Sequence, residues 1–596
     1  MSDSARETAA GERVHRPEGW PVTDTPRRVA IIGWATLSNQ AREGSGYNLS
    51  ASELASGLSM SGHEVFYLQS GMRYDARIRP AVTKRETWRG IECYEVRNSP
   101  NVSPAYCNFT NPTGEIATPS QAHLVVDWLE RVRAEVVHIH SLEGYGFDVI
   151  HAVRASGRPV VVTLHNYWMV CSQVDLLHNE TTVCHDYEGG KRCETCLETP
   201  DPKSVRVKRR IEQTAERVVG YSAAQSMKRT ALGTAKRLKN GFSTPRVTVR
   251  EEDLVKADPE AGRGYEGAET EEHGGCVDFG LRAAANEAPM TPAISADDEN
   301  ERFLRVDHHL TVLNDYGRRR QAGVEALNAA SAVIPPSSFL LEVHRAMGLE
   351  RGHSRRVLLG QPHLDQMNRV ARRSAFYDQK PWDPETSPGP LRLAFMGTAR
   401  PNKGLEVLAS AIPLLDRDVR RRCHFSIRAG GYDWAFRKRL SVYPEVSMLG
   451  GYHPYQLVSA MGEYHVGLLP HIWFENSPIV LLEHLHAGKF VISSRLGGPV
   501  DWIVEPGTDA ADGGSGNGLL FRGGDPEDFA SAITRLVRGE VSLPTPREVH
   551  AVSALQSYPG HVGEVASIYE RVLKGEAVGD EAEVVVREVG VEAGVT

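Results

Sequence analysis

Two glutamates with seven residues between them, Glu475 and Glu483, have the type and spacing best suited to chemistry in this sequence. Ser477 suits the N-cap of a helix between them, and Pro478 suits its first position, where a missing N–H costs nothing. Gly488 is a natural end for that helix. Because the helix is apolar almost all round, it should be buried, and a buried carboxylate needs a partner. Glu483 therefore predicts a ligand that carries a pair of hydroxyls.

The start of this helix predicts an anion site. The N–H groups of Ile479 and Val480 point out of the helix start, where negative charge is stabilised, and Ser477 lies beside them. Glu475 precedes the helix, and Glu483 lies roughly 8 Å along its axis. These positions suit an elongated ligand, with a sugar at Glu475, phosphates at the helix start and the diol of a ribose at Glu483.

The two glutamates, followed by His-Ala-Gly-Lys-Phe-Val-Ile-Ser-Ser-Arg-Leu-Gly-Gly at 486–498, resemble the nucleotide-sugar motif of glycosyltransferase family 4. The resemblance covers about 27–240 and 300–573. It implies the GT-B fold, an α/β architecture of two Rossmann-like domains that face each other across a cleft. It also implies transfer from a nucleotide-diphosphate sugar, with retention of configuration and no catalytic metal, to a sugar, lipid or small-molecule acceptor.

Strands and helices alternate along both halves of the chain. Short apolar runs predict buried parallel strands, with helical segments between them, as in a doubly wound sheet. The predicted strands are 29–32, 63–68, 136–141, 159–166, 332–337, 392–397, 425–428, 446–449, 466–470, 490–494 and 516–521.

A glycine-bearing loop at 42–47 follows the first strand. Gly44 and Gly46 would let the backbone approach a phosphate or a sugar closely, although an ordinary tight turn gives the same pattern. The position of the loop, as in the N-terminal domain of the family, favours contact with a ligand. Ser50 and Glu53 match a capping box, which predicts a helix from there to about residue 61.

His165 lies at the carboxyl end of the predicted strand 159–166, where open α/β sheets bind ligands. The resemblance implies that His165 faces the acceptor and the donor sugar. The alternative is a histidine that only hydrogen-bonds a loop carbonyl. For His138 and His140, inside a buried strand, mutual hydrogen bonding is the favoured interpretation.

The loop after strand 392–397 carries two cations, Arg400 and Lys403. In the family, two cations here hold the diphosphate, and such fixed cations stabilise the charge that grows on a departing phosphate. Lys403 matches the family pattern, whereas Thr398 stands where the arginine is expected and Arg400 comes two residues later. The resemblance also implies that Gly451 lines the pocket of the nucleotide base.

Four cysteines follow His165 and lie within one stretch of 26 residues: Cys171, Cys184, Cys193 and Cys196. Cys193 and Cys196 have the spacing of a metal knuckle, and four thiolates could close a tetrahedral zinc site. Four reduced, buried thiols are an equally open alternative.

Length, charge and hydrophobicity limit the classes of function and the cellular location that fit this sequence. A chain of 596 residues is too long for one core, and a net charge of −8 provides no basic field for nucleic acid. No apolar run is long enough to span a membrane, and the N-terminus lacks the apolar core of a signal peptide, so we expect a cytoplasmic protein. The basic stretch 203–239 predicts a solvated face or, as the alternative, peripheral contact with the inner face of the membrane.

The predicted organisation has five parts. They are a disordered leader (1–26), an N-terminal acceptor-side domain (27–338) with a cysteine-rich loop (171–196) and a disordered insertion (242–298), a linker (339–390), a nucleotide-sugar domain (391–573) and a disordered acidic tail (574–596). Two rival functions share this fold: a sugar-nucleotide epimerase, and a catalytically silent binding or scaffold protein. The epimerase would need an additional acid near the anomeric carbon.

Overall fold

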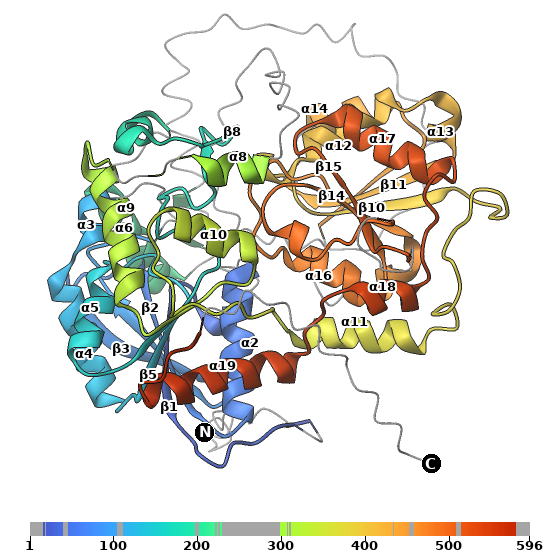
Figure 1. Cartoon of the computed structure of the whole chain (residues 1–596). Coiled ribbons are helices and arrows are strands. Elements are labelled where there is room, and N and C mark those ends of the chain that lie inside the picture. The colour runs from blue at the N-terminus through green and yellow to red at the C-terminus, as the bar shows by residue number, and fades with distance from the viewer. Residues whose placement is uncertain are drawn as a thin grey trace, which may run out of the picture.

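The computed structural model describes residues 16–17, 20–39, 46–103, 111–196, 202–220, 223–224, 227–228, 299–306, 308, 311–432, 434–451, 458–507 and 514–579. Two α/β domains stand side by side, each built on one largely parallel sheet (Figure 1). The predicted pair of Rossmann-like domains is therefore confirmed. Gly44, the insertion 242–298 and most of the predicted leader and tail lie outside the described residues.

Within the described residues, the N-terminal sheet has seven strands in the order β3-β4-β2-β1-β5-β6-β9. Neighbouring strands are parallel except β3, which runs antiparallel to β4. The strands are β1 (Arg28–Gly33), β2 (Glu64–Arg73), β3 (Ala81–Trp88), β4 (Ile91–Arg97), β5 (Val136–Ile139), β6 (Val160–Thr163) and β9 (Ala332–Ile334).

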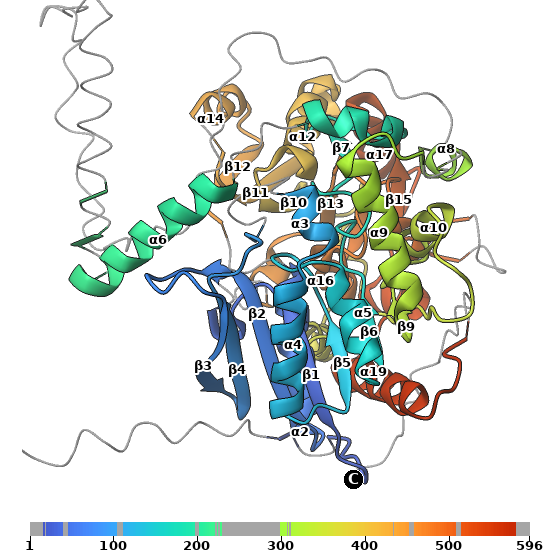
Figure 2. The ribbon, with the colours of Figure 1, turned by 90° about the vertical axis from the view of Figure 1, so that its left-hand side faces the viewer.

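Helices cover both faces of this sheet because side chains alternate along each strand. In β1, Val29 and Ile31 pack under α2 and α19, whereas Ala30 and Ile32 pack under α4, α5 and α9. Figure 2 shows α4 and α5 lying along one face. The helices of this half are α2 (Gly46–Met60), α3 (Pro112–Ile116), α4 (Pro119–Arg131), α5 (Asp148–Ala155), α6 (Pro202–Val219), α8 (Glu299–Arg305), α9 (Asp315–Ala329) and α10 (Ser338–Ala346).

The C-terminal sheet is parallel, with the order β12-β11-β10-β13-β14-β15 among the described residues. Its strands are β10 (Leu391–Thr398), β11 (Cys423–Gly430), β12 (Val446–Leu449), β13 (Val466–Leu469), β14 (Phe490–Ser494) and β15 (Gly518–Phe521). One face carries α12 (Leu405–Ala411), α13 (Arg417–Arg421) and α17 (Pro526–Val537), and the other α11 (Pro362–Arg373), α16 (Ile479–His486) and α18 (Pro546–Val552). A further helix, α14, spans Trp434–Leu440.

The packing divides the chain differently from the predicted boundaries. Residues 558–573, predicted to belong to the C-terminal domain, form α19 (Tyr558–Leu573), the last described helix, whose apolar side chains join the core of the N-terminal sheet (Figure 1). The predicted linker 339–390 is also structured: α10 packs into the N-terminal core and α11 into the C-terminal one. Sequence periodicity identifies a helix but does not indicate which sheet it covers.

The start of one helix also differs from prediction. The helix α2 begins at Gly46, four residues before Ser50, so Ser50 and Glu53 lie buried inside it rather than forming a capping box. The helix α6 spans Pro202–Val219, mostly within the basic stretch 203–239, and projects from the N-terminal domain (Figure 2). No helix in the described part of the chain is long and apolar enough to cross a membrane.

Candidate functional site

The segment 474–488 lies at the junction of the two domains. The helix α16 begins at Ile479 with Pro478 as its N-cap, one residue later than predicted. Ser477 is therefore not the cap, and its buried hydroxyl has no hydrogen-bond partner among the described residues. The N–H groups of Ile479 and Val480 stand at the helix start, where no earlier turn supplies carbonyl acceptors.

Glu475 and Lys403 form an ion pair in the loop before α16. The carboxyl of Glu475 is buried and the Lys403 ammonium about one-third exposed. Burial alone raises the pKa of Glu475, but the Lys403 ammonium and His471 more than offset this and hold the pKa below its usual value. Lys403 also lies 5.1 Å from the centre of the Trp473 ring. The structure therefore brings the two residues predicted to hold sugar and diphosphate into direct contact.

Lys403 is held in this position because its loop packs closely against the loop that follows β13. Gly404 adopts a left-handed conformation, and a β-carbon there would lie 1.6 Å from the carbonyl oxygen of Pro470. The N–H of Ile472 donates to the carbonyl of Asn402 at 3.0 Å. The glycine that directly follows Lys403 is therefore required by the close packing of the two loops. Arg400 is exposed at the beginning of the same short 3-10 turn, Pro401–Lys403.

Glu483 has one carboxylate oxygen bound and one open. Its Oε1 lies 3.1 Å from Nε2 of His363 on α11, and both side chains are buried. Its Oε2 is buried with no hydrogen-bond partner among the described residues. Because buried polar atoms are nearly always paired, this oxygen points to a missing polar ligand. His363 was not predicted; nothing but its position directly after Pro362 at a helix start singles it out.

The N-terminal domain reaches this site at two points. A β-carbon on Gly46 would lie 3.1 Å from Cδ1 of Ile479, which places the start of α2 against the start of α16. Asn476 donates from Nδ2 to the backbone carbonyl of His165 at 2.6 Å. The structure thereby brings Gly46 close to Ile479, and His165 close to the residue that follows Glu475.

His165 is half-buried and lies next to two buried histidines, His140 and His138. Its Nε2 lies 2.9 Å from Nδ1 of His140, and the two rings stack. His138 in turn contacts Tyr569 of α19 at 2.6 Å and Thr163 at 2.7 Å. Desolvation lowers the pKa of His165 to about 3, so the ring is neutral at physiological pH. His165 can therefore exchange hydrogen bonds with a sugar but carries no charge toward it.

Gly451 follows β12, the edge strand of the C-terminal sheet, and is exposed. A β-carbon there would lie 3.6 Å from the backbone nitrogen of Gly430. Its contact with a nucleotide base stays a prediction.

The four cysteines occupy one folded loop, but it is not arranged as a metal centre. The described residues contain no group of three or more His, Cys, Asp or Glu placed to hold a metal ion. Cys196 is engaged instead with Gln173 Oε1 at 3.0 Å and the Leu177 carbonyl at 3.6 Å. Burial raises the pKa of Cys184 to about 11 and that of Cys193 to about 12. The structure thus does not support the predicted zinc site and agrees with protonated thiols, of which Cys196 is buried and the other three are half-buried.

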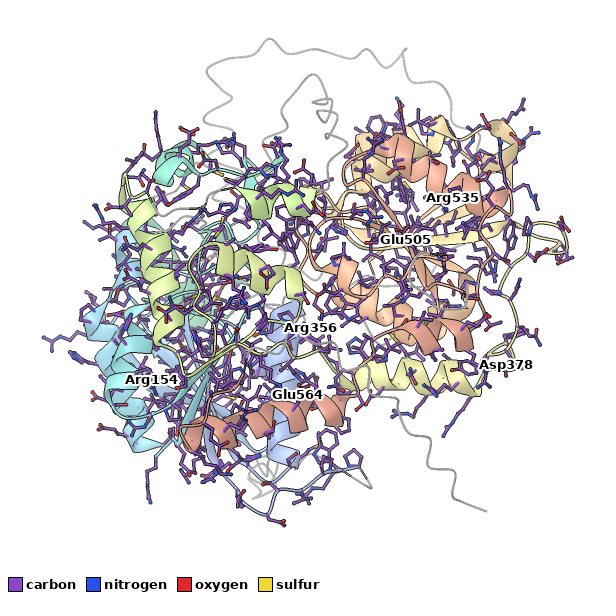
Figure 3. All side chains as sticks on the ribbon, viewed as in Figure 1. Arg154, Arg356, Asp378, Glu505, Arg535 and Glu564 are labelled. Carbon is purple, nitrogen blue, oxygen red and sulfur yellow. The ribbon has the colours of Figure 1, made fainter. Side chains whose placement is uncertain are left out.

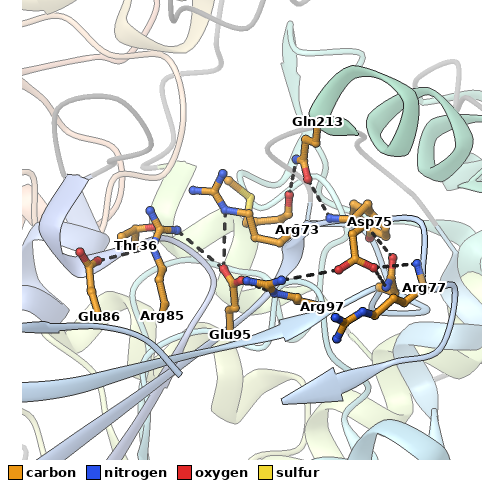
Figure 4. A network of polar contacts seen from close by, with 12 residues as sticks. Thr36, Arg73, Asp75, Arg77, Arg85, Glu86, Glu95, Arg97 and Gln213 are labelled. Atoms are coloured by element: carbon orange, nitrogen blue, oxygen red, sulfur yellow. Dashed lines mark hydrogen bonds and ion pairs between the residues drawn. The ribbon is translucent and has the colours of Figure 1, made fainter. Parts of the chain in front are cut away.

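A second charged cluster lies at the carboxyl ends of β2 and β4 (Figure 4). Buried Glu95 faces Arg97 at 2.7 Å and Arg73 at 3.8 Å, beside a pocket of about 270 Å³. Gln213 of α6 accepts from the N–H of Tyr74 and donates to the Met72 carbonyl. We assign this network to holding α6 on the sheet.

Direct contacts also join the domains away from the glutamates. Arg356, which lies between the domains in Figure 3, donates to Asp501 at 3.2 Å, and both side chains are largely buried. Phe474 packs between Phe303 and Phe339 of the N-terminal half, with ring centres 5.0 and 4.9 Å apart. The loop that carries Glu475 is therefore fixed from both domains.

Two Rossmann-like domains with a paired acidic motif at their junction define the class of GT-B glycosyltransferases. The comparisons with known families agree. Residues 45–224 match the family described as "Glycosyl transferase 4-like domain", and residues 390–539 match "Glycosyl transferases group 1". The two matches together span more than half of the chain. The chain therefore belongs to the GT-B glycosyltransferases.

Individual relatives are distant. The chain is 34% identical over 86 residues to a glycogen synthase of Bordetella bronchiseptica, which covers 14% of this chain and 17% of the relative. Sucrose-phosphate synthase from Thermosynechococcus elongatus aligns with a TM-score of 0.46 at 13% identity, over 92% of this chain and 100% of that one. An α,α-trehalose-phosphate synthase from Burkholderia xenovorans aligns with a TM-score of 0.47 at 10% identity, with the same shares covered. These likenesses are too weak to indicate a substrate.

Proposed function

We propose that this protein transfers a sugar from a nucleotide-diphosphate sugar to a sugar, lipid or small-molecule acceptor, with retention of configuration and without a catalytic metal. The observation that carries the proposal is the arrangement around α16. Glu475 is paired with Lys403 at one end, and Glu483 at the other presents a buried oxygen without a partner. The spacing suits a donor that lies along the helix start.

The donor-binding roles follow from the hydrogen-bonding atoms of the site that have no protein partner among the described residues. Oε2 of Glu483 accepts from a ribose hydroxyl while His363 holds Oε1. The N–H groups of Ile479 and Val480 donate to the diphosphate, as helix starts do for phosphates. Gly46, packed on Ile479, leaves room for the phosphates because it has no side chain. Glu475 accepts from hydroxyls of the transferred sugar.

Lys403 connects binding to catalysis. An ammonium has three N–H donors, so Lys403 can keep Glu475 and donate to the diphosphate as well. When the bond between sugar and phosphate breaks, negative charge grows on the leaving diphosphate. A cation already fixed beside it stabilises that charge more in the transition state than in the ground state. This accounts for catalysis by a protein cation in place of a metal ion.

Retention of configuration agrees with the weak basicity of the side chains near the proposed sugar position. An inverting enzyme needs a general base aligned with the acceptor. Glu475 is held by Lys403, and the neutral ring of His165, with its pKa of about 3, is a weak base. The diphosphate oxygens are then the base that takes the acceptor proton on the same face.

Two variants test the assignment. Glu475→Gln should lower turnover at least a hundredfold while the Kd for a nucleoside diphosphate changes less than about threefold. Glu483→Gln should weaken the same Kd roughly 10- to 100-fold, because a charged hydrogen bond contributes about 1.5–3 kcal/mol. Titration calorimetry with a panel of nucleoside diphosphates and mass spectrometry of products measure the two effects.

Glu527→Gln, an exposed carboxylate on α17, is the matched control and should leave both quantities unchanged. Wild-type affinity in the Glu483→Gln protein would remove the ribose assignment. An interconverted nucleotide sugar without transfer would establish the rival epimerase. Binding with neither transfer nor donor hydrolysis would establish a silent binding protein.

We further propose that α6 rests on an anionic membrane surface. Val207, Ile211 and Val218 are 51, 64 and 77% exposed, and at 100° per residue they lie within 40° of one another. Exposed Lys203 and Lys208 flank this apolar stripe. An apolar stripe with basic neighbours is the pattern of an interfacial helix.

Flotation with vesicles tests this second proposal. Wild-type protein should float with vesicles that contain 30% anionic lipid and stay behind with neutral ones. Replacing Ile211 and Val218 by serine should abolish flotation and leave the melting temperature unchanged, because both side chains are exposed. Equal flotation of that variant would refute the proposal.

A further inference from the structure

Gly497 is locked against the backbone of Glu475. The two residues form a parallel bridge, and the N–H of Gly498 donates to the Glu475 carbonyl at 2.6 Å. Gly497 has φ +76°, and a β-carbon there would lie 2.1 Å from the same carbonyl oxygen. A shift of Gly497 therefore shifts the backbone that carries the Glu475 carboxylate.

The other side of Gly497 is held by a residue from the N-terminal half, Asn300 on α8. Oδ1 of Asn300 accepts from the Gly497 N–H at 2.8 Å, and Nδ2 donates to the Gly497 carbonyl at 3.2 Å. Asn300 is buried. Its amide thus pairs with both backbone groups of one residue, as a neighbouring strand would. An amide side chain offers a donor and an acceptor at the spacing that these two backbone groups require.

The helix α8 is itself held by the cysteine-bearing loop. Glu299 pairs with Nε2 of His185, which directly follows Cys184, at 2.7 Å. Phe303 of the same helix packs on Phe474, the residue before Glu475. A continuous set of contacts therefore runs from the cysteine-bearing loop through α8 to Gly497 and Glu475.

We propose that Asn300 is a positioning residue for Glu475, acting through Gly497. Through α8, the position of the cysteine-bearing loop then affects the position of Glu475. The activity readout rests on the proposed function. Asn300 hydrogen-bonds Gly497, which is bridged to Glu475, so its loss should affect turnover and leave nucleotide binding in place.

Three substitutions distinguish positioning from simple packing. Asn300→Ala removes both hydrogen bonds and should lower kcat 10- to 100-fold, with the Kd for a nucleoside diphosphate within threefold of wild type. Asn300→Asp sets a carboxylate against the Gly497 carbonyl and should lower kcat by a similar factor at pH 8. Asn328→Ala is the matched control, because Asn328 also bridges a backbone N–H and carbonyl, those of Glu350 and Gly348, but within the N-terminal domain.

The pH dependence of Asn300→Asp gives a signature that a structural role would not produce. A protonated carboxyl has one donor and one acceptor, like the lost amide, so kcat relative to wild type should rise as pH falls from 8 to 5.5. The other titratable and charged groups nearby are Glu299 and Arg302 on α8, His185 and His308 beside it, and Glu475 with Lys403 and His471 across from it. They are common to both proteins, so the ratio to wild type removes their contribution.

Amide hydrogen exchange provides a readout that does not depend on activity. In Asn300→Ala, peptides that contain Glu475 and Gly497 should exchange at least tenfold faster, while peptides from β15 and α17 keep the wild-type rate. Wild-type turnover or unchanged exchange in Asn300→Ala would overturn the proposal. If the wild-type protein transfers no sugar, the proposed function fails, and the exchange result still decides the role of Asn300.

Discussion

The ion pair with Lys403 controls the charge state of the Glu475 carboxyl. With Lys403 present, the folded-state pKa of Glu475 lies below its ordinary value of 4.5, so the pair contributes stability above about pH 4.5 and loses it as pH falls further. Without Lys403, burial dominates and raises that pKa. The charged carboxylate then destabilises the fold increasingly as pH rises above 4.5.

Lys403→Met should therefore lower the free energy of unfolding by about 1–3 kcal/mol at pH 7, less than for a fully buried pair because the ammonium is partly exposed. The deficit should shrink toward pH 4.5. Urea denaturation across this pH range measures it. Lys438→Met is the control, since Lys438 also lies over a tryptophan, 4.9 Å from Trp434, but is exposed. A deficit independent of pH would mean that Lys403 acts by packing alone.

Among individual residues, the sequence predicted those that belong to a local motif in the chain. Glu475 precedes the helix that carries Glu483, and Lys403 precedes a glycine that only a close loop approach explains. Their partners could not be predicted. His363 and Asn300 lie more than a hundred residues from the groups they contact, and spacing along the chain carries no information about such pairs.

The cysteine-bearing loop gives a prediction at the scale of an element. Burial raises the pKa of Cys184, Cys193 and Cys196 to about 11–12, so their thiolate fraction at pH 7.4 is very small. In the native protein these thiols should react with an aromatic disulfide reagent at least a hundredfold more slowly than after unfolding in urea. Metal analysis runs alongside, and one bound zinc per chain would contradict the prediction.

Elements were predicted well where the pattern is strong. Strands such as β12 and β14 match their predicted bounds because both are short apolar runs in a parallel sheet. The pair β3 and β4 was missed, since β3 is a half-exposed edge strand whose Lys, Arg and Glu residues mask the alternation. The start of α2 was misplaced because Ser50 and Glu53 fit a cap locally, whereas tertiary packing extends the helix to Gly46.

At the scale of the whole molecule, α19 connects the last residues of the chain to the first strand. Val562 is fully buried in the core around Val29 and Ile31. Val562→Ala should cost about 2 kcal/mol, and hydrogen exchange should report the loss in β1 and β2. Val537→Ala, a matched change on α17, should lower protection in β10 and β15 instead. Loss of protection in the C-terminal sheet from Val562→Ala would contradict the assigned packing.

The return of α19 also concerns how the protein is made. The ribosome finishes β9 and then adds the entire C-terminal domain before α19 emerges, which takes roughly 10–45 s at 5–20 residues per second. Throughout that interval the face of the first sheet that carries Val29 and Ile31 lacks one of its two covering helices. The nascent chain therefore exposes an apolar surface to chaperones and to neighbouring nascent chains until α19 packs onto the first sheet.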